Sequence, residues 1–199
     1  MTINLLAEGF MEEVVAKKLL PFCGHELGAV YGKKGCAFVR EKAVSFRHLA
    51  TTETGLLVLT DFRDAKKECI LEALHEYIFS KFSNPPNTYL CRFAVNELES
   101  WLLADREGLA KYLGISVAMM PLQPEREEYP KQALVGLARR SRRKAIRDGI
   151  APPQGHRASV GPVYQGLMEE FICKYWNIEN AALYAPSLAR CIYRLQELV

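Results

Sequence analysis

The chain has 199 residues, of which 49% are hydrophobic and 25% are charged, and its formal net charge is +3. This composition fits one large globular domain or a core with an appended part, and so small a net charge does not by itself indicate a nucleic-acid partner. No apolar run reaches the length of a membrane span and the amino terminus lacks a secretory pattern, so we expect a cytoplasmic protein without a membrane partner.

The six cysteines are scattered along the chain without a Cys-x-x-Cys pair. Most of them lie in apolar segments, which predicts buried thiols in a reducing compartment. The four histidines have no ligand spacing with these cysteines, so the sequence does not predict a structural zinc site.

An apolar run at residues 3–7 predicts a short strand that is buried on both faces of a sheet. The pattern becomes helical after Gly9, so Glu8 stands at the carboxyl end of the strand, where open α/β sheets place their ligands. Glu12 falls in the first turn of the helix and can lean back towards Glu8. Two carboxylates this close repel each other unless a cation or a proton lies between them.

A second strand is expected at 25–32, and a helix is expected from Cys36 to Ala50. The Gly-Lys-Lys-Gly sequence at 32–35 joins them. It resembles a phosphate-binding loop only loosely, because the P-loop spacing and its terminal Ser or Thr are missing. We therefore interpret it as a basic turn.

The run Leu56–Thr60 predicts a third buried strand, which ends at Asp61 and is followed shortly by Asp64. A helix is expected from Lys66 to Phe82, because apolar residues recur there on one stripe. If this strand and the first one are parallel neighbours, their acidic ends lie at the same edge of the sheet.

Four carboxylates would then converge at that edge, namely Glu8, Glu12, Asp61 and Asp64. Clustered carboxylates are the oxygen-rich environment that Mg²⁺ or Mn²⁺ prefers. The alternative is purely structural. In that case Glu8 caps a helix, Glu12 is solvated, and the two aspartates are turn and N-cap residues.

A fourth strand is expected at 89–95, and Glu97 follows its end directly, which makes it a further candidate for the acidic cluster. Alternatively, Glu97 belongs to an acidic first turn that suits the helix dipole, with Trp101 packed in the core. The alternation of strands and helices predicts an α/β core at 1–114, with a small parallel sheet flanked by helices.

Residues 115–199 are expected to form a helical C-terminal extension packed on that core, after an irregular stretch at 115–129. A helix is expected to start at Pro130 and to continue through a strongly basic segment. This density of charge suits phosphate binding, although a solvated helix surface is the alternative. We call these residues the basic segment; they are Arg139, Arg140, Arg142, Arg143, Lys144 and Arg147.

Strand-Glu8-Gly9-x-x-Glu12, followed by strand-Asp61-x-x-Asp64, resembles a Toprim domain, the metal-binding domain of topoisomerases, primases and overcoming-lysogenization-defect nucleases. Residues 94–105, Ala-Val-Asn-Glu-Leu-Glu-Ser-Trp-Leu-Leu-Ala-Asp, resemble a signature of the bacterial domain of unknown function 4276 family. Pro130-Lys131 before a helix and a closing helix at 187–198 also fit that family, so the resemblance spans nearly the whole chain.

This resemblance implies a Rossmann-like Toprim core in which Glu8, Glu12 and Asp61 bind a divalent metal ion, in a family associated with phage defence. The sequence departs from the Toprim pattern at one point. Asp-x-Asp is expected after the third strand, but position 63 is Arg63 and the second aspartate is displaced to Asp64.

These observations predict Mg²⁺- or Mn²⁺-dependent hydrolysis of phosphodiester bonds in DNA or RNA. Glu8 is the candidate general base or second-metal ligand, and Arg63 or Lys131 could stabilise charge on the phosphate. The metal ligands would come from Glu8, Glu12, Asp61, Asp64 and Glu97, and the basic segment would hold the nucleic-acid backbone. The alternative is a non-catalytic module that binds or senses nucleic acid or protein and keeps a vestigial metal site.

Overall fold

A computed structural model describes residues 1–67, 69–79, 82 and 84–198. The chain divides into two compact units. The first consists of Met1–Val95 with Ser187–Val199, and the second is Asn96–Pro186. The sequence had instead predicted a single boundary after residue 114, with the closing helix in the extension. The closing helix belongs to the first unit, and the second unit begins directly after the fourth strand.

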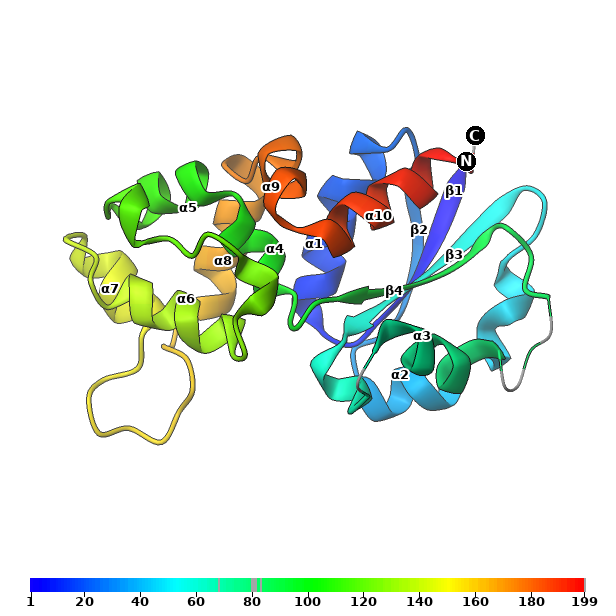
Figure 1. The fold of residues 1–199 in the computed structure, drawn as a ribbon, viewed down its shortest axis with the longest axis horizontal. Helices are drawn as coiled ribbons and strands as arrows, with labels where there is room; N and C mark the ends of the chain where they lie inside the picture. The colour runs from blue at the N-terminus through cyan, green and yellow to red at the C-terminus, as the bar shows by residue number, and fades with distance from the viewer. Residues whose placement is uncertain (68, 80–81, 83, 199) are drawn as a thin grey trace. The chain divides into compact units, whose positions relative to one another are not determined.

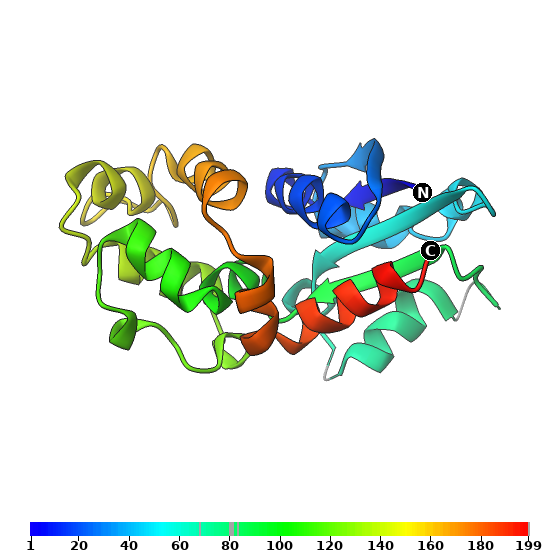
Figure 2. The same cartoon turned by 90° about the horizontal axis from the view of Figure 1, so that it is seen from above.

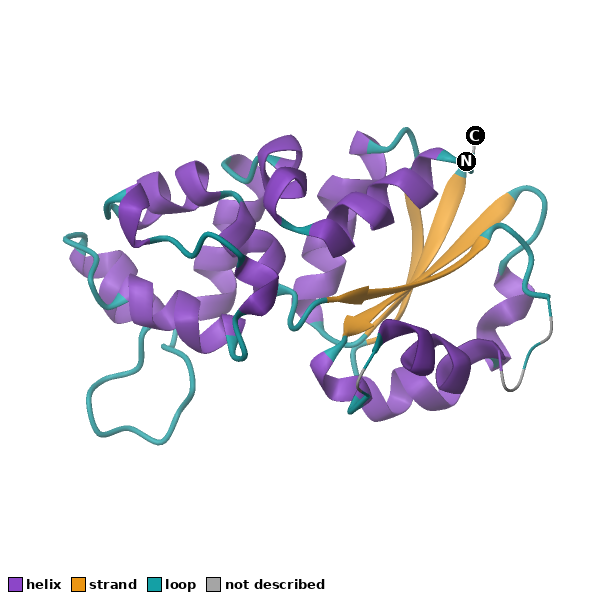
Figure 3. Ribbon diagram, viewed as in Figure 1, coloured by secondary structure: helices purple, strands orange, loops and turns teal. Residues whose placement is uncertain are grey.

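The first unit contains a four-stranded parallel sheet, coloured orange in Figure 3, with the strand order β2-β1-β3-β4. The predicted α/β class with a small parallel, Rossmann-like sheet flanked by helices is thereby confirmed. The strands are β1 (Thr2–Ala7), β2 (Glu26–Gly32), β3 (Thr54–Asp61) and β4 (Tyr89–Ala94).

The two central strands, β1 and β3, have the near-continuous apolar sequences of strands covered on both faces. Leu5, Leu6, Leu57 and Val58 are completely buried. Figures 1 and 2 show helices on both faces of this sheet, α2 and α3 on one and α1 and α10 on the other. These helices are α1 (Phe10–Phe22), α2 (Cys36–Lys42), α3 (Ile70–Leu74) and α10 (Pro186–Gln196).

Two helices of the first unit are shorter than the sequence predicted. The helix expected to reach Ala50 ends at Lys42 and is followed by a 3₁₀ turn, Ser45–Leu49. It stops there because the carbonyl of Ala43 accepts a hydrogen bond from the buried hydroxyl of Tyr89 at 2.7 Å, instead of one from a helical amide.

The helix predicted from Lys66 to Phe82 begins only at Ile70, and a π-helical turn, His75–Phe79, continues it. The predicted apolar stripe is also wrong at Leu71, whose side chain is 76% exposed. Residues 68, 80 and 81 of the predicted helix lie outside the described residues.

The prediction that most cysteines are buried is wrong for half of them, although all six are free thiols. Cys69 and Cys173 are exposed and Cys36 is partly exposed. Each lies at or near the end of a helix, where an apolar neighbourhood in the sequence does not guarantee cover in the fold.

The second unit is helical, as the sequence predicted for most of this region. Trp101 and Trp176 form part of its core, and the indole Nε1 of Trp176 donates to the carbonyl of Trp101 at 3.2 Å. Among its described residues, the helices are α4 (Glu99–Ala104), α5 (Arg106–Leu113), α6 (Pro130–Ala138), α7 (Lys144–Ile150), α8 (Tyr164–Lys174) and α9 (Ile178–Tyr184).

The basic segment is not one continuous helix, contrary to the prediction. Helix α6 ends at Ala138 and α7 begins at Lys144. The chain turns between them because Ser141 is buried, and its hydroxyl donates to the carbonyl of Leu113 at 2.6 Å. The six basic residues therefore do not share a single helical face.

Among the described residues, none of the helices combines the length and the apolar character that a membrane crossing requires.

Candidate metal-binding site

The candidate site lies at the carboxyl edge of the sheet, between β1 and β3. The chain passes from β1 to β2 on one side of β1, and it then crosses to β3 on the other side. The gap between β1 and β3 is therefore the topological switch point, where open α/β sheets bind ligands. Because Ala7 pairs with Leu59, Glu8 follows β1 at the level of Thr60.

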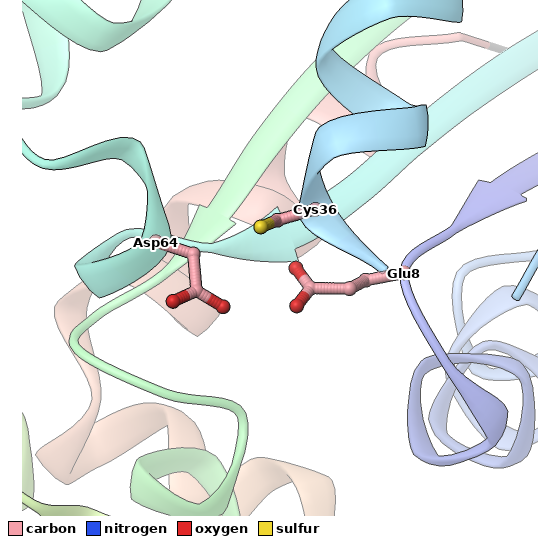
Figure 4. Close-up of side chains that lie close together, drawn as sticks. All are labelled: Glu8, Cys36 and Asp64. Atoms are coloured by element: carbon pink, nitrogen blue, oxygen red, sulfur yellow. The ribbon is translucent and has the colours of Figure 1, made fainter. Parts of the chain in front are cut away.

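Three side chains from separate elements meet at this point. Glu8 follows β1, Cys36 is the first residue of α2, and Asp64 lies in the turn after β3. Their carboxylate oxygens and thiol sulfur all lie within 4.8 Å of one another. Figure 4 shows the Glu8 carboxylate pointing towards Asp64, with the Cys36 sulfur next to both.

The carboxylate of Glu8 is held in place by β3. The hydroxyl of Thr60 donates to Oε2 of Glu8 at 2.7 Å, and the backbone amide of Asp61 approaches the same oxygen at 3.4 Å. Both donors act on one oxygen, so they fix the orientation of the side chain without neutralising its charge.

Asp64 reaches the site because β3 is followed by a 3₁₀ turn, Arg63–Ala65. The amide of Phe62 donates to the carbonyl of Ala94 at 2.8 Å, and the turn closes at Lys66 in the left-handed region, with φ of 52°. This turn brings Asp64 to Glu8.

Cys36 is brought to the site by the basic turn at 32–35, which is anchored to the end of β1. The amide of Lys33 donates to the carbonyl of Ala7 at 2.9 Å, and the amide of Gly35 donates to the carbonyl of Glu8 at 3.0 Å. Gly32 has a φ of 94°, and a Cβ there would lie 2.3 Å from the Ala7 carbonyl oxygen. Only glycine permits this close approach.

The sequence interpretation missed Cys36 as a site residue, because it treated all the cysteines alike. The available signal was its position directly after Gly-Lys-Lys-Gly, at the start of a helix that follows a parallel strand. That position faces the same sheet edge as Glu8.

The electrostatics of the site are those of crowded carboxylates. The pKa of Glu8 is raised from its ordinary 4.5 to about 7. Burial is the largest cause, and a hydrogen bond with Asp64 and the charges of Asp64 and Glu12 also raise the pKa. The Thr60 hydrogen bond acts in the opposite direction and lowers it. A proton on Glu8 relieves the repulsion between these crowded carboxylates, and a cation bound there would relieve it as well.

Cys36 is affected by the same carboxylates. Burial raises the pKa of its thiol, and the charges of Asp64 and Glu8 raise it further. Without a cation the sulfur is therefore a neutral thiol at neutral pH. A metal ion would reverse this preference, because a coordinating thiol loses its proton.

The other carboxylates predicted for the first unit are placed differently. Glu12 is buried, and its Oε2 accepts a hydrogen bond from the amide of Gly9 at 2.9 Å, so it caps α1. Asp61 is buried at the end of β3 and contacts Glu8 through its amide. Neither belongs to the group formed by Glu8, Cys36 and Asp64 in the described part of the chain. Arg63 is exposed beside Asp64.

Glu97 and Lys131 belong to the second unit. The amide of Lys131 donates to Oε2 of Glu97 at 2.9 Å, while its ammonium group lies 3.3 Å from Oε1 of Glu99. Glu99 is buried and also accepts a hydrogen bond from the hydroxyl of Tyr164 at 2.7 Å. Catalytic or ligand roles for Glu97 and Lys131 stay predictions.

Within the basic segment, two arginines have contacts inside the second unit. Arg143 donates through Nη1 to the carbonyl of Tyr112 at 3.1 Å, and Arg147 pairs with Asp148 and donates to the carbonyl of Ser141. The other four are exposed, namely Arg139, Arg140, Arg142 and Lys144.

Comparisons of this chain with known protein families, with curated proteins and with solved structures give no match. The functional argument therefore depends on the geometry of the site.

Proposed function

We propose that this protein hydrolyses phosphodiester bonds in nucleic acid with the help of a divalent cation, Mg²⁺ or Mn²⁺, bound at Glu8 and Asp64. The observation that carries the proposal is the meeting of these two carboxylates with Cys36 at the topological switch point, with ligand atoms within 4.8 Å of one another. Carboxylate pairs in this position suit hard divalent cations.

The donor set fits such an ion. Glu8 and Asp64 supply two negative charges, and the charged groups that act most strongly on Glu8 are the carboxylates of Asp64 and Glu12. Repulsion between them is relieved by a dication more effectively than by a proton. The sulfur of Cys36 is a softer ligand, which favours Mn²⁺ over Mg²⁺ if it takes part.

A divalent cation bound here would polarise the phosphate and lower the pKa of an attacking water. Glu8 is held in place by Thr60 and would release its proton to solvent when the ion binds. Asp64 would help to hold the ion, and the adjacent exposed Arg63 would stabilise charge on the phosphate. The exposed members of the basic segment would hold the nucleic-acid backbone without reading its sequence.

Incubation with supercoiled plasmid or single-stranded RNA tests this proposal. Cleavage should require Mn²⁺ or Mg²⁺ and should stop in a chelator. Glu8→Gln should reduce the rate at least a hundredfold, about 2.7 kcal/mol in activation free energy. Glu13→Gln is the matched control, because Glu13 lies close by in α1 but pairs with Lys17 and Lys33 instead. Cleavage by Glu8→Gln at the wild-type rate would contradict the proposal.

A non-catalytic binding or sensing role is the second candidate, and one observation favours it. The described group offers one ligand atom from each of three residues, while Glu12 caps α1 through Gly9. That set suits one ion, whereas many phosphodiester hydrolases use two. Metal binding without turnover on any nucleic acid would favour this role.

A further inference from the structure

A second feature of the first unit lies towards the opposite end of the sheet from the candidate metal site. A cavity of about 340 Å³ opens along β4, which is an edge strand. Its walls come from the loop before β4, from the first half of β4, from the α3 segment and from α10. The polar residues among them are Asn87, Arg92 and Arg194, and most of the others are apolar.

Arg92 is the unusual residue of this cavity. It is partly buried, and within the described part of the chain its buried Nε has no hydrogen-bond partner. None of the ion pairs among the described residues includes Arg92. An arginine cannot escape this situation by deprotonation, because its guanidinium keeps its charge in proteins.

The surroundings of Arg92 increase the positive charge instead of compensating it. Burial lowers the pKa of the Arg92 guanidinium, and the charges of Arg194 and Arg190 lower it further. The adjacent thiols of Cys91 and Cys191 are neutral, because burial raises the pKa of each to about 12. Arg194 itself has an exposed partner, Glu197, at 3.2 Å.

A partly buried, unpaired cation is costly for a folded protein, and natural proteins keep such groups where a ligand supplies the counter-charge. Guanidinium groups bind phosphate and carboxylate groups through paired hydrogen bonds. The apolar walls, which include Leu74, Ile78 and Tyr89, would surround an uncharged body attached to that group.

We propose that this cavity binds a small organic anion, with a phosphate or carboxylate group held by Arg92 and an apolar body against the walls. The site is separate from the proposed metal-dependent activity and does not depend on it. Its place on the edge strand and beside α10 would let the anion link the closing helix to the sheet, because Arg92 lies on β4 and Arg194 lies on α10.

Calorimetric titration of the full chain tests this proposal, with phenyl phosphate, benzoate and inorganic phosphate as probes. A chelator is kept in all samples, so that anion binding through a metal ion at Glu8 and Asp64 cannot contribute. We expect phenyl phosphate or benzoate to bind more tightly than inorganic phosphate, because only the first two carry an apolar body. Whichever binds more tightly identifies the charged group that the cavity prefers.

Variants then locate the binding. Arg92→Gln should weaken it at least about tenfold, since a hydrogen-bonded charge pair is lost. Arg190→Gln is the matched control on α10, outside the cavity wall, and should change the affinity by less than about threefold. Arg142→Gln tests the basic segment of the second unit and should have no effect.

Arg92→Met provides a check that does not depend on the choice of probe. Without any anion, this variant should melt at or above the wild-type temperature, because an unpaired charge has been replaced by an apolar side chain of similar length. The proposal is overturned if none of the probes binds saturably at millimolar concentration, if Arg92→Gln binds like the wild type, or if Arg92→Met melts well below it.

Discussion

The buried carboxylates of the second unit and the carboxylates of the candidate site in the first unit are used in opposite ways. In the second unit, buried Glu99 accepts from Tyr164 and pairs with Lys131, and buried Asp105 accepts from the amides of Gly108 and Asn177. In the first unit, Glu8 and Asp64 face each other, and burial and mutual repulsion raise the pKa of Glu8. Carboxylates surrounded by hydrogen-bond donors and cations stabilise a fold, whereas carboxylates that repel each other are candidates for binding a cation.

The largest expected effect comes from a carboxylate of the structural kind. Asp105→Ala should lower the free energy of unfolding by roughly 3 kcal/mol, because two partly buried amide donors lose a fully buried, charged acceptor. Asp105 caps α5 at Gly108 and fixes the start of α9 through Asn177. Urea denaturation of the variant measures the loss. Asp64→Ala is the contrasting variant and should leave the stability of the metal-free protein unchanged or increase it.

The second prediction concerns the pH dependence that Glu8 creates. Its pKa is raised on folding from 4.5 to about 7, so its contribution to stability is fully present below pH 4.5 and is lost as the pH rises through 7. The shift corresponds to roughly 3 kcal/mol, which solvent screening at this partly exposed side chain reduces to about 2 kcal/mol. Glu8→Gln should therefore be more stable than the wild type at pH 8 by about 2 kcal/mol and equally stable at pH 4.

Glu13, in the first turn of α1, supplies a control of opposite sign. Hydrogen bonds with Lys17 and Lys33 lower its pKa, so its contribution is present above pH 4.5 and is lost as the pH falls. Glu13→Gln should thus lose stability at neutral pH, where Glu8→Gln gains it. If both variants respond to pH in the same direction, the contrast between paired and repelling carboxylates is wrong.

A third prediction asks whether Cys36 belongs to the site. Cys36→Ser should keep Mg²⁺ binding nearly unchanged but should weaken the binding of a soft ion such as Cd²⁺ by about tenfold, since the thiolate ligand is lost. Cys69→Ser, at an exposed cysteine, is the control and should change neither affinity. Equal loss of both ions in Cys36→Ser would mean that the cysteine supports the structure of the turn instead.

The smallest expected effect belongs to the basic segment. If four phosphates are engaged, the slope of log affinity against log salt should be about −3.6 on duplex DNA. Replacing the exposed Arg140 and Arg142 by alanine should flatten that slope by about 1.8 and weaken all sequences alike. A variant with the wild-type slope would show that these two side chains are only solvated.

The sheet was predictable because its signals are local. Apolar runs bounded by glycine and acidic residues mark the strands, and their alternation with helices fixes the parallel arrangement and the sheet edge where Glu8 lies. The helix breaks were not predictable, because each depends on a contact between distant residues. The hydroxyl of Tyr89 donates to the Ala43 carbonyl at the end of α2. Between α6 and α7, the hydroxyl of Ser141 donates to the Leu113 carbonyl.

The candidate site was predictable in part for the same reason. Glu8 and Asp64 follow strands, so the sequence could place them together once the strands were neighbours. Cys36 was missed because its position depends on two backbone hydrogen bonds from the basic turn to the end of β1. The separation of Glu12 and Asp64 into different roles depends on the capping of Gly9 and on the 3₁₀ turn after β3, and no residue pattern specifies either choice.

The central claim is that Glu8 and Asp64 together hold a divalent cation, and calorimetric titration with Mn²⁺ tests it most directly. Titration at pH 6.5 in two buffers of different ionisation enthalpy should show one Mn²⁺ per chain and release of about one proton per ion, because the ion displaces the proton that Glu8 carries below its raised pKa. Asp64→Asn should abolish both signals, and Glu13→Gln should preserve them. Absence of Mn²⁺ binding by the wild type, or equal binding by Asp64→Asn, would contradict the account.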